Sequence, residues 1–92
     1  MKTSFDHLSK FKFKVIITKP DNTQLKNIEI IITSNSEAIN DNTSINIDIN
    51  DIITRTLSDN SEERFKVIQR TFQPEIHKKI PEHFQLALKK LI

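Results

Sequence analysis

The stretch DNSEERFKVIQRTFQPEI, Asp59 to Ile76, decides which fold the sequence predicts. Asp59 or Asn60 can act as a helix N-cap, and Glu62 or Glu63, three residues later, completes a capping-box pattern. The large apolar residues that follow recur at spacings of three and four, the period of one helical face: Phe65, Ile68, Phe72 and Ile76. The stretch therefore predicts a helix.

Two prolines divide the C-terminal part of the chain. Pro74 has no N–H and disfavours helix at Gln73, and Pro81 suits the first position of a last helix. That last helix would place one apolar face toward the core: Ile80, Phe84, Ala87, Leu88 and Leu91. Whether the region holds two helices or three is left open by the spacing.

The first half of the chain has the alternation of strands. Phe11, Phe13, Val15 and Ile17 alternate mainly with lysines, and Ile28, Ile30 and Ile32 form a second period-two run. Between them, Lys19–Gln24 contains a proline and an Asp-Asn pair, which are typical of a turn. We expect a hairpin here, followed over Ser34–Thr43 by a polar loop, in which a single helical turn around Ser36–Ile39 is an alternative.

The segment SINIDINDI, Ser44 to Ile52, allows two interpretations. Asn46, Asp48 and Asn50 have the spacing that begins a calcium-binding loop, but Asp51 and Leu57 stand where such a loop needs glycine and glutamate. The isoleucines at alternate positions favour a strand, so we predict a strand over 44–49 that binds no calcium. The IITRTL segment that follows can be a short helix or a strand extension.

The expected fold is therefore α+β, one domain over residues 1–92. A three-stranded antiparallel sheet, made of the hairpin and the third strand, would be covered on one face by two or three C-terminal helices. The expected core has a helical half and a sheet half: Phe65, Ile68, Phe72, Phe84, Leu88 and Leu91 against Phe13, Val15, Ile17, Ile30 and Ile47. No internal repeat is evident in the sequence.

Composition excludes several classes of function. With no cysteine, the chain has no disulfides, thiolate metal sites or cysteine nucleophiles, and with no glycine it has no glycine-rich phosphate loop. Turns at positive φ must then use asparagine or aspartate. The three histidines have no metal-ligand spacing and are read as solvated. We expect no catalytic residues, no cofactor and no metal site.

The charge pattern favours a binding protein. Residues 1–33 carry a net charge of +3, residues 34–60 of −4 and residues 61–92 of +3, an alternation more typical of protein contacts than of nucleic-acid binding. No segment has the apolar run of a signal peptide or a membrane span, so we expect a cytoplasmic protein without membrane contact. The abundance of Ile, Asn and Lys indicates an AT-rich genome, such as that of a phage or mobile element.

The leading hypothesis is a non-enzymatic protein-binding module, an inhibitor or regulator of a host protein. Nucleic-acid binding through the basic Lys10–Lys14 strand face, a structural subunit of a larger assembly, and a homodimer remain alternatives. The predicted partner surface combines lysines with apolar residues on the sheet face opposite the core: Lys10, Lys12, Lys14, Ile16 and Ile31. A second candidate surface lies on the expected helix: Lys66, Val67 and Arg70.

Overall fold

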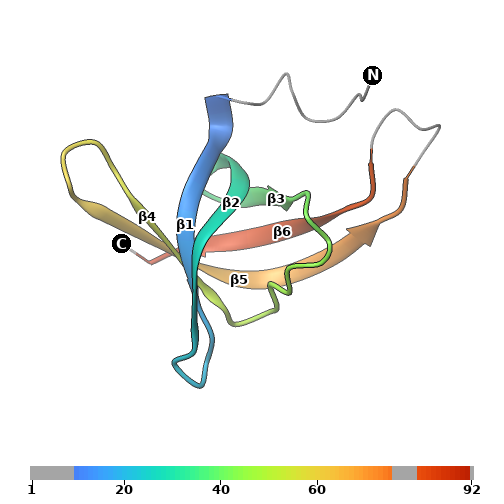
Figure 1. Cartoon of the computed structure of the whole chain (residues 1–92), viewed down its shortest axis with the longest axis horizontal. Coiled ribbons are helices and arrows are strands. Elements are labelled where there is room, and N and C mark those ends of the chain that lie inside the picture. The colour runs from blue at the N-terminus through green and yellow to red at the C-terminus, as the bar shows by residue number, and fades with distance from the viewer. Residues whose placement is uncertain (1–9, 76–80, 92) are drawn as a thin grey trace.

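Six antiparallel strands form a closed barrel in the computed structural model, which describes residues 10–75 and 81–91 (Figure 1). The strands are β1 Lys12–Thr18, β2 Gln24–Ser34, β3 Glu37–Asn40, β4 Ile52–Thr56, β5 Glu62–Gln73 and β6 His83–Lys90. Around the barrel they follow the order β1-β2-β3-β6-β5-β4, and β4 closes it against β1. The prediction of an α+β fold is therefore wrong, because the described part of the chain contains no α-helix.

The barrel consists of two three-stranded meanders in equivalent positions. β1, β2 and β3 form one and β4, β5 and β6 the other, and the two are joined by pairing β1 with β4 and β3 with β6. Exchanging the two meanders reproduces the strand order, so the topology has a pseudo-two-fold symmetry. No repeat in the sequence indicated this symmetry.

The two meanders begin with the same turn. In the first, Asn22 N–H donates to Lys19 O (2.8 Å), and Thr23 N–H donates to Asp21 Oδ1 (2.9 Å). Residues 57–61, which lie 38 positions later, repeat these bonds at 2.9 Å each. All residues at positive φ in the described chain are asparagines, as the lack of glycine predicted: Asn22, Asn27, Asn50 and Asn60.

Asp59 therefore lies in the turn that joins β4 to β5 and does not cap a helix. Its carboxylate accepts the N–H and the hydroxyl of Ser61 (2.9 and 2.5 Å), an Asx-type turn that uses the same side-chain-to-backbone bond as an N-cap. These bonds hold the pKa of Asp59 below its usual value. The predicted capping box is wrong, because the Asp59 carboxylate binds Ser61 within a turn and Glu62 and Glu63 belong to strand β5.

The predicted first helix is the long strand β5. A bulge between Val67 and Gln69 inserts Ile68 as an extra residue, and this shifts the alternation by one position. Phe65 and Val67 are fully buried, whereas Ile68 and Phe72 are 49% and 47% exposed. Because of this extra residue, the large apolar residues of β5 do not follow a period of two, and their spacing of three and four resembles that of a helical face.

The predicted last helix is strand β6. Leu86 and Leu88 point into the core and Phe84 packs against it, which is a period of two. Ala87 lies on the other side of the strand, and Leu91 is 45% exposed. Ile80 lies outside the described residues.

The core fills the interior of the barrel. The sheet half of the predicted core is correct, since Val15, Ile17, Ile30 and Ile47 are buried and Phe13 packs against them. From the predicted helical half, only Phe65 and Leu88 are fully inside. The complete buried cluster is Val15, Ile17, Ile30, Ile32, Ala38, Ile47, Ile53, Phe65, Val67, Leu86 and Leu88.

The segment between β3 and β4 is a loop and not the predicted strand. Ile45 and Ile47 do turn toward the core, as the alternation indicated, but Ile49 is 49% exposed. Buried Asn40 holds the start of the loop, donating to Ile45 O (3.0 Å) and accepting from Asn42 N–H (3.2 Å). The IITRTL segment, left open by the sequence, supplies strand β4.

Three charged residues, one each from β4, β5 and β6, form a hydrogen-bonded network: Arg55, Glu63 and Lys90. Arg55 donates from Nε to Glu63 Oε1 (2.9 Å), and Lys90 Nζ donates to Glu63 Oε2 (2.8 Å). The Arg55 guanidinium covers the Phe13 ring at 4.4 Å from its centroid. The hydrogen bonds from Lys90 and Arg55 lower the pKa of Glu63.

Replacing Phe65 and Phe72 by alanine separates the barrel from the predicted fold. Phe65→Ala should lower the free energy of unfolding by about 3–5 kcal/mol because it empties the core. Phe72→Ala should cost only about 1 kcal/mol, since that ring is half exposed and makes one aromatic contact. Urea unfolding measures both; equal losses would contradict the strand assignment of β5.

The lowered pKa of Glu63 predicts that the free energy of unfolding decreases at acidic pH. The stabilisation is complete above the usual glutamate value of 4.5 and is lost as the pH falls through the lower folded-state pKa. Glu63→Gln should reduce this pH dependence of the free energy of unfolding, measured by urea titrations between pH 3 and 7. Exposed Glu29, without an ion pair among the described residues, is the matched control as Glu29→Gln.

Candidate binding surface

The outer face of β1, β4, β5 and β6 gathers residues from distant parts of the sequence. One row across it runs from Ile16 through Thr54 to Arg64, as the strand pairing dictates. The next row has four members: Thr18, Ile52, Lys66 and Lys89. Because the neighbouring positions along each strand point into the core, these side chains point outward. We call this surface, together with Lys14, the basic face.

The charges on the basic face are mostly uncompensated. Among the described residues, Lys14, Lys66 and Lys89 form no ion pair, and Arg64 lies 3.7 Å from Glu62 across an exposed surface. A hollow of about 370 Å³ lies on this face, with walls that include Ile16, Ile52, Glu62 and Arg64. Free cations around half-buried aliphatic side chains can contact an acidic surface and bury apolar area together.

The residues of the first predicted surface separate in the structure. Lys14 and Ile16 belong to the basic face, while Lys12 lies at the start of β1 and pairs with Asp41 at 3.7 Å. Lys10 is exposed just before the strand, and its ammonium lies 5.4 Å from the Phe11 ring centroid. Ile31 is fully buried, so it cannot contribute to an exposed surface as predicted.

The second predicted surface also divides. Lys66 stands on the basic face, which joins it to Ile16 through the register of β4. Val67 is fully buried in the core, so its predicted exposure is wrong. Arg70 points to the other side of β5, where it lies 3.6 Å from Asp48 and stacks on Phe84 at 4.0 Å. The sequence could not place Lys14, Ile52 and Arg64 together, because only the strand pairing brings them there.

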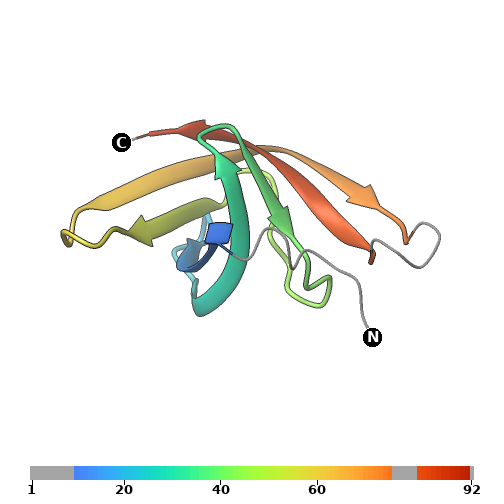
Figure 2. The same cartoon turned by 90° about the horizontal axis from the view of Figure 1, so that it is seen from above.

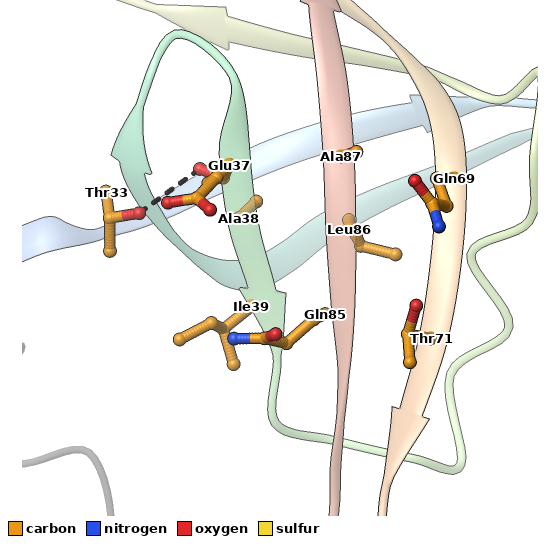
Figure 3. A pocket seen from close by; sticks show the side chains of 9 residues that line it. All are labelled: Thr33, Glu37, Ala38, Ile39, Gln69, Thr71, Gln85, Leu86 and Ala87. Carbon is orange, nitrogen blue, oxygen red and sulfur yellow. Dashed lines mark hydrogen bonds between the residues drawn. The ribbon is translucent and has the colours of Figure 1, made fainter.

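A second hollow, of about 470 Å³, lies on the outer side of β3, β6 and β5 (Figure 3). Polar uncharged side chains such as Gln69, Thr71 and Gln85 form much of its wall. Its one charged residue is Glu37, whose backbone oxygen accepts from the Thr33 hydroxyl (3.4 Å). Without a second titratable group beside Glu37, this hollow offers no acid–base pair.

The loop that resembles the start of a calcium site surrounds a lysine. Lys19 Nζ donates to Asn46 O (2.6 Å) and to Asp51 Oδ2 (2.5 Å), and it lies 3.9 Å from Asp48. Asp51 is only 1% exposed and also accepts from the Asp48 N–H (2.8 Å). The oxygen atoms of this loop therefore converge on the protein's own ammonium group.

No metal centre is present among the residues that the structure describes, where no group of three His, Asp or Glu side chains could hold an ion. His83 is buried with its Nδ1 2.9 Å from Pro81 O, so the expectation of a solvated side chain is wrong for this histidine. His7 and His77 lie outside the described residues. Over the described ranges no helix is long and apolar enough to cross a membrane.

Comparisons with protein-family models, with curated proteins and with solved structures each found no match to this chain.

Removal of the Lys19 ammonium should destabilise the barrel. Lys19→Met leaves the buried Asp51 carboxylate without its cation, which costs about 3–5 kcal/mol when a buried pair is broken. Adding Asp51→Asn to the same chain should recover a large part of the loss. Urea unfolding of the four proteins of this cycle measures the coupling; strictly additive losses would contradict the pairing.

Proposed function

We propose that this chain is a non-enzymatic protein-binding module that contacts an acidic surface of its partner through the basic face. The observation that carries the proposal is the set of free cations, Lys14, Lys66 and Lys89, around Ile16 and Ile52. The acids near the loop are already engaged with Lys19 and Arg70, so they do not neutralise these lysines. Lysines steer an acidic partner, while the isoleucines supply apolar contact.

Nucleic acid is the alternative that the same cations allow. Single-stranded nucleic acid is usually bound by aromatic side chains that stack on bases, beside cations that follow the backbone. The five described aromatic residues lie elsewhere. Phe13 and Phe65 point inward, and Phe72 pairs with Phe84 on the opposite side of β5 and β6. Phe11 precedes β1, beside Lys10. An aliphatic basic face without rings therefore supports a protein partner better.

Regulation of a host protein and membership of a larger assembly are both compatible with such a contact. The inhibitor or regulator hypothesis rests on the small size of the chain and on its composition. It remains the more specific proposal, because a small chain with a basic face can act by covering a surface of its target.

Charge reversal on two parts of the surface tests the proposal. Lys66→Glu/Lys89→Glu should abolish the capture of a specific partner from the native host, detected by affinity purification and mass spectrometry. Lys10→Glu/Lys12→Glu changes the net charge by the same amount at the start of β1 and should retain capture. Circular dichroism establishes that both variants fold. The reverse pattern would place the contact at the originally predicted lysines.

A salt series separates the two classes of partner. Binding of the wild-type chain to single-stranded and duplex oligonucleotides should be weak already at 50 mM salt. A nucleic-acid protein with several phosphate contacts would bind there and lose about 10³-fold or more between 50 and 200 mM salt. Such a loss, sensitive to Lys66→Glu/Lys89→Glu, would show that nucleic acid is the ligand.

A further inference from the structure

The distal half of β5 has an open edge. β4 pairs with β5 only along Glu62–Lys66, and β6 covers the other side of β5 as far as Gln73. The loop residues Asn50 and Asp51 occupy the next position, through hydrogen bonds with Val67 (2.7 and 2.9 Å). Beyond Val67, the described residues include no further backbone partner on this edge, and Figures 1 and 2 show β5 and β6 extending away from β4.

This edge is only partly protected: it has a bulge at Ile68 and one charged residue, Arg70, whose guanidinium lies against Asp48 and Phe84 of its own chain. β2 also has a stretch that pairs on one side only, before Ile31, but there Lys26, Glu29 and the positive-φ residue Asn27 interrupt it. Charges and bulges of this kind prevent edge-to-edge pairing. The β5 edge differs from the β2 edge in that it also exposes two large apolar residues, Ile68 and Phe72.

The edge is also complementary to itself. Ile68-Gln69-Arg70-Thr71-Phe72 reads apolar, polar, charged, polar, apolar in either direction. We propose that two copies of the chain pair through this segment as antiparallel strands, with the two-fold axis at Arg70. Each Ile68 then lies opposite Phe72 of the other copy, and each Gln69 opposite Thr71, so like residues meet on both faces of the joined sheet.

Arg70 would face its own copy across the axis, and its environment compensates for this. Its guanidinium lies 3.6 Å from Asp48 and 4.0 Å from the Phe84 ring centroid within the same chain. Each charge is therefore drawn toward its own loop and carries its own counter-ion. Ile49 is 49% exposed and directly precedes Asn50, whose N–H donates to Val67 O. It therefore lies beside the position at which the strand of the second copy would begin to pair with β5.

Single cysteines test the register without competing thiols, since the chain has none. Gln69→Cys and Thr71→Cys replace exposed polar side chains, and mixing the two variants under mild oxidation should give a disulfide between different chains. Opposed residues have Cα atoms about 4.5–5.5 Å apart, within disulfide range. Each variant alone should cross-link poorly, because identical residues would lie about 7–8 Å apart on the diagonal.

Two results would overturn this arrangement. Efficient cross-linking of Thr71→Cys to itself would place the axis at Thr71, and no cross-link in the mixture would exclude the pairing. Sedimentation of the wild-type chain should show, with rising concentration, a species of twice the monomer mass of 10.8 kDa. A chain that stays monomeric at millimolar concentration would leave the edge for a strand of another protein and contradict self-association.

A charge swap provides a second readout. Ile68→Lys/Phe72→Lys and Ile68→Glu/Phe72→Glu should each be monomeric, since like charges would then face each other in two opposed pairs. Mixing them should restore a dimer that contains one chain of each kind. A mixture that stays monomeric, with a wild-type chain that dimerises, would show that these residues do not face each other. Lys66→Glu/Lys89→Glu should leave dimerisation unchanged, which separates this inference from the proposed function.

Discussion

The pairing of β1 with β4 is the constraint on which the rest of the barrel depends. Three residue pairs form this seam, and the central one joins Ile17 to Ile53, both fully buried. Lys19 and Asp51 come directly after β1 and directly before β4, so their ion pair continues the register of the seam by one position. An apolar contact inside the barrel and a buried charge pair at its end thus hold the two meanders together.

The seam also creates the basic face. Lys14 and Ile16 come from β1, whereas Arg64 and Lys66 come from β5, and β4 lies between them with Thr54 and Ile52 facing outward. The β1 segment is far in the sequence from the β4 and β5 segments that supply the other residues. Closure of the barrel, which buries the core, therefore determines which charges lie together on the exterior.

Equivalent positions in the two meanders hold different kinds of residue pair, apolar in the first hairpin and charged in the second. Ile17 pairs with Leu25 in the first hairpin, and at the same positions of the second hairpin Arg55 pairs with Glu63. Arg55 also covers the Phe13 ring, so it contributes apolar contact as well as charge. The two hairpins share the same Asp-Asn turn, while the side chains at these strand positions differ.

The sequence by itself determined the first hairpin, most of the inward-facing residues of β1 and β2, and the use of asparagine at positive φ. These depend on local alternation and on backbone conformation, which neighbouring residues decide. It also determined that Ile45 and Ile47 turn inward, but not that they do so in a loop. Only the tertiary structure decided the second half, because the bulge at Ile68 gave β5 a helical spacing and Asp59 makes a bond common to turns and N-caps. The basic face and the buried positions of Ile31 and Val67 likewise follow from strand pairing between residues far apart in the chain, which no local pattern encodes.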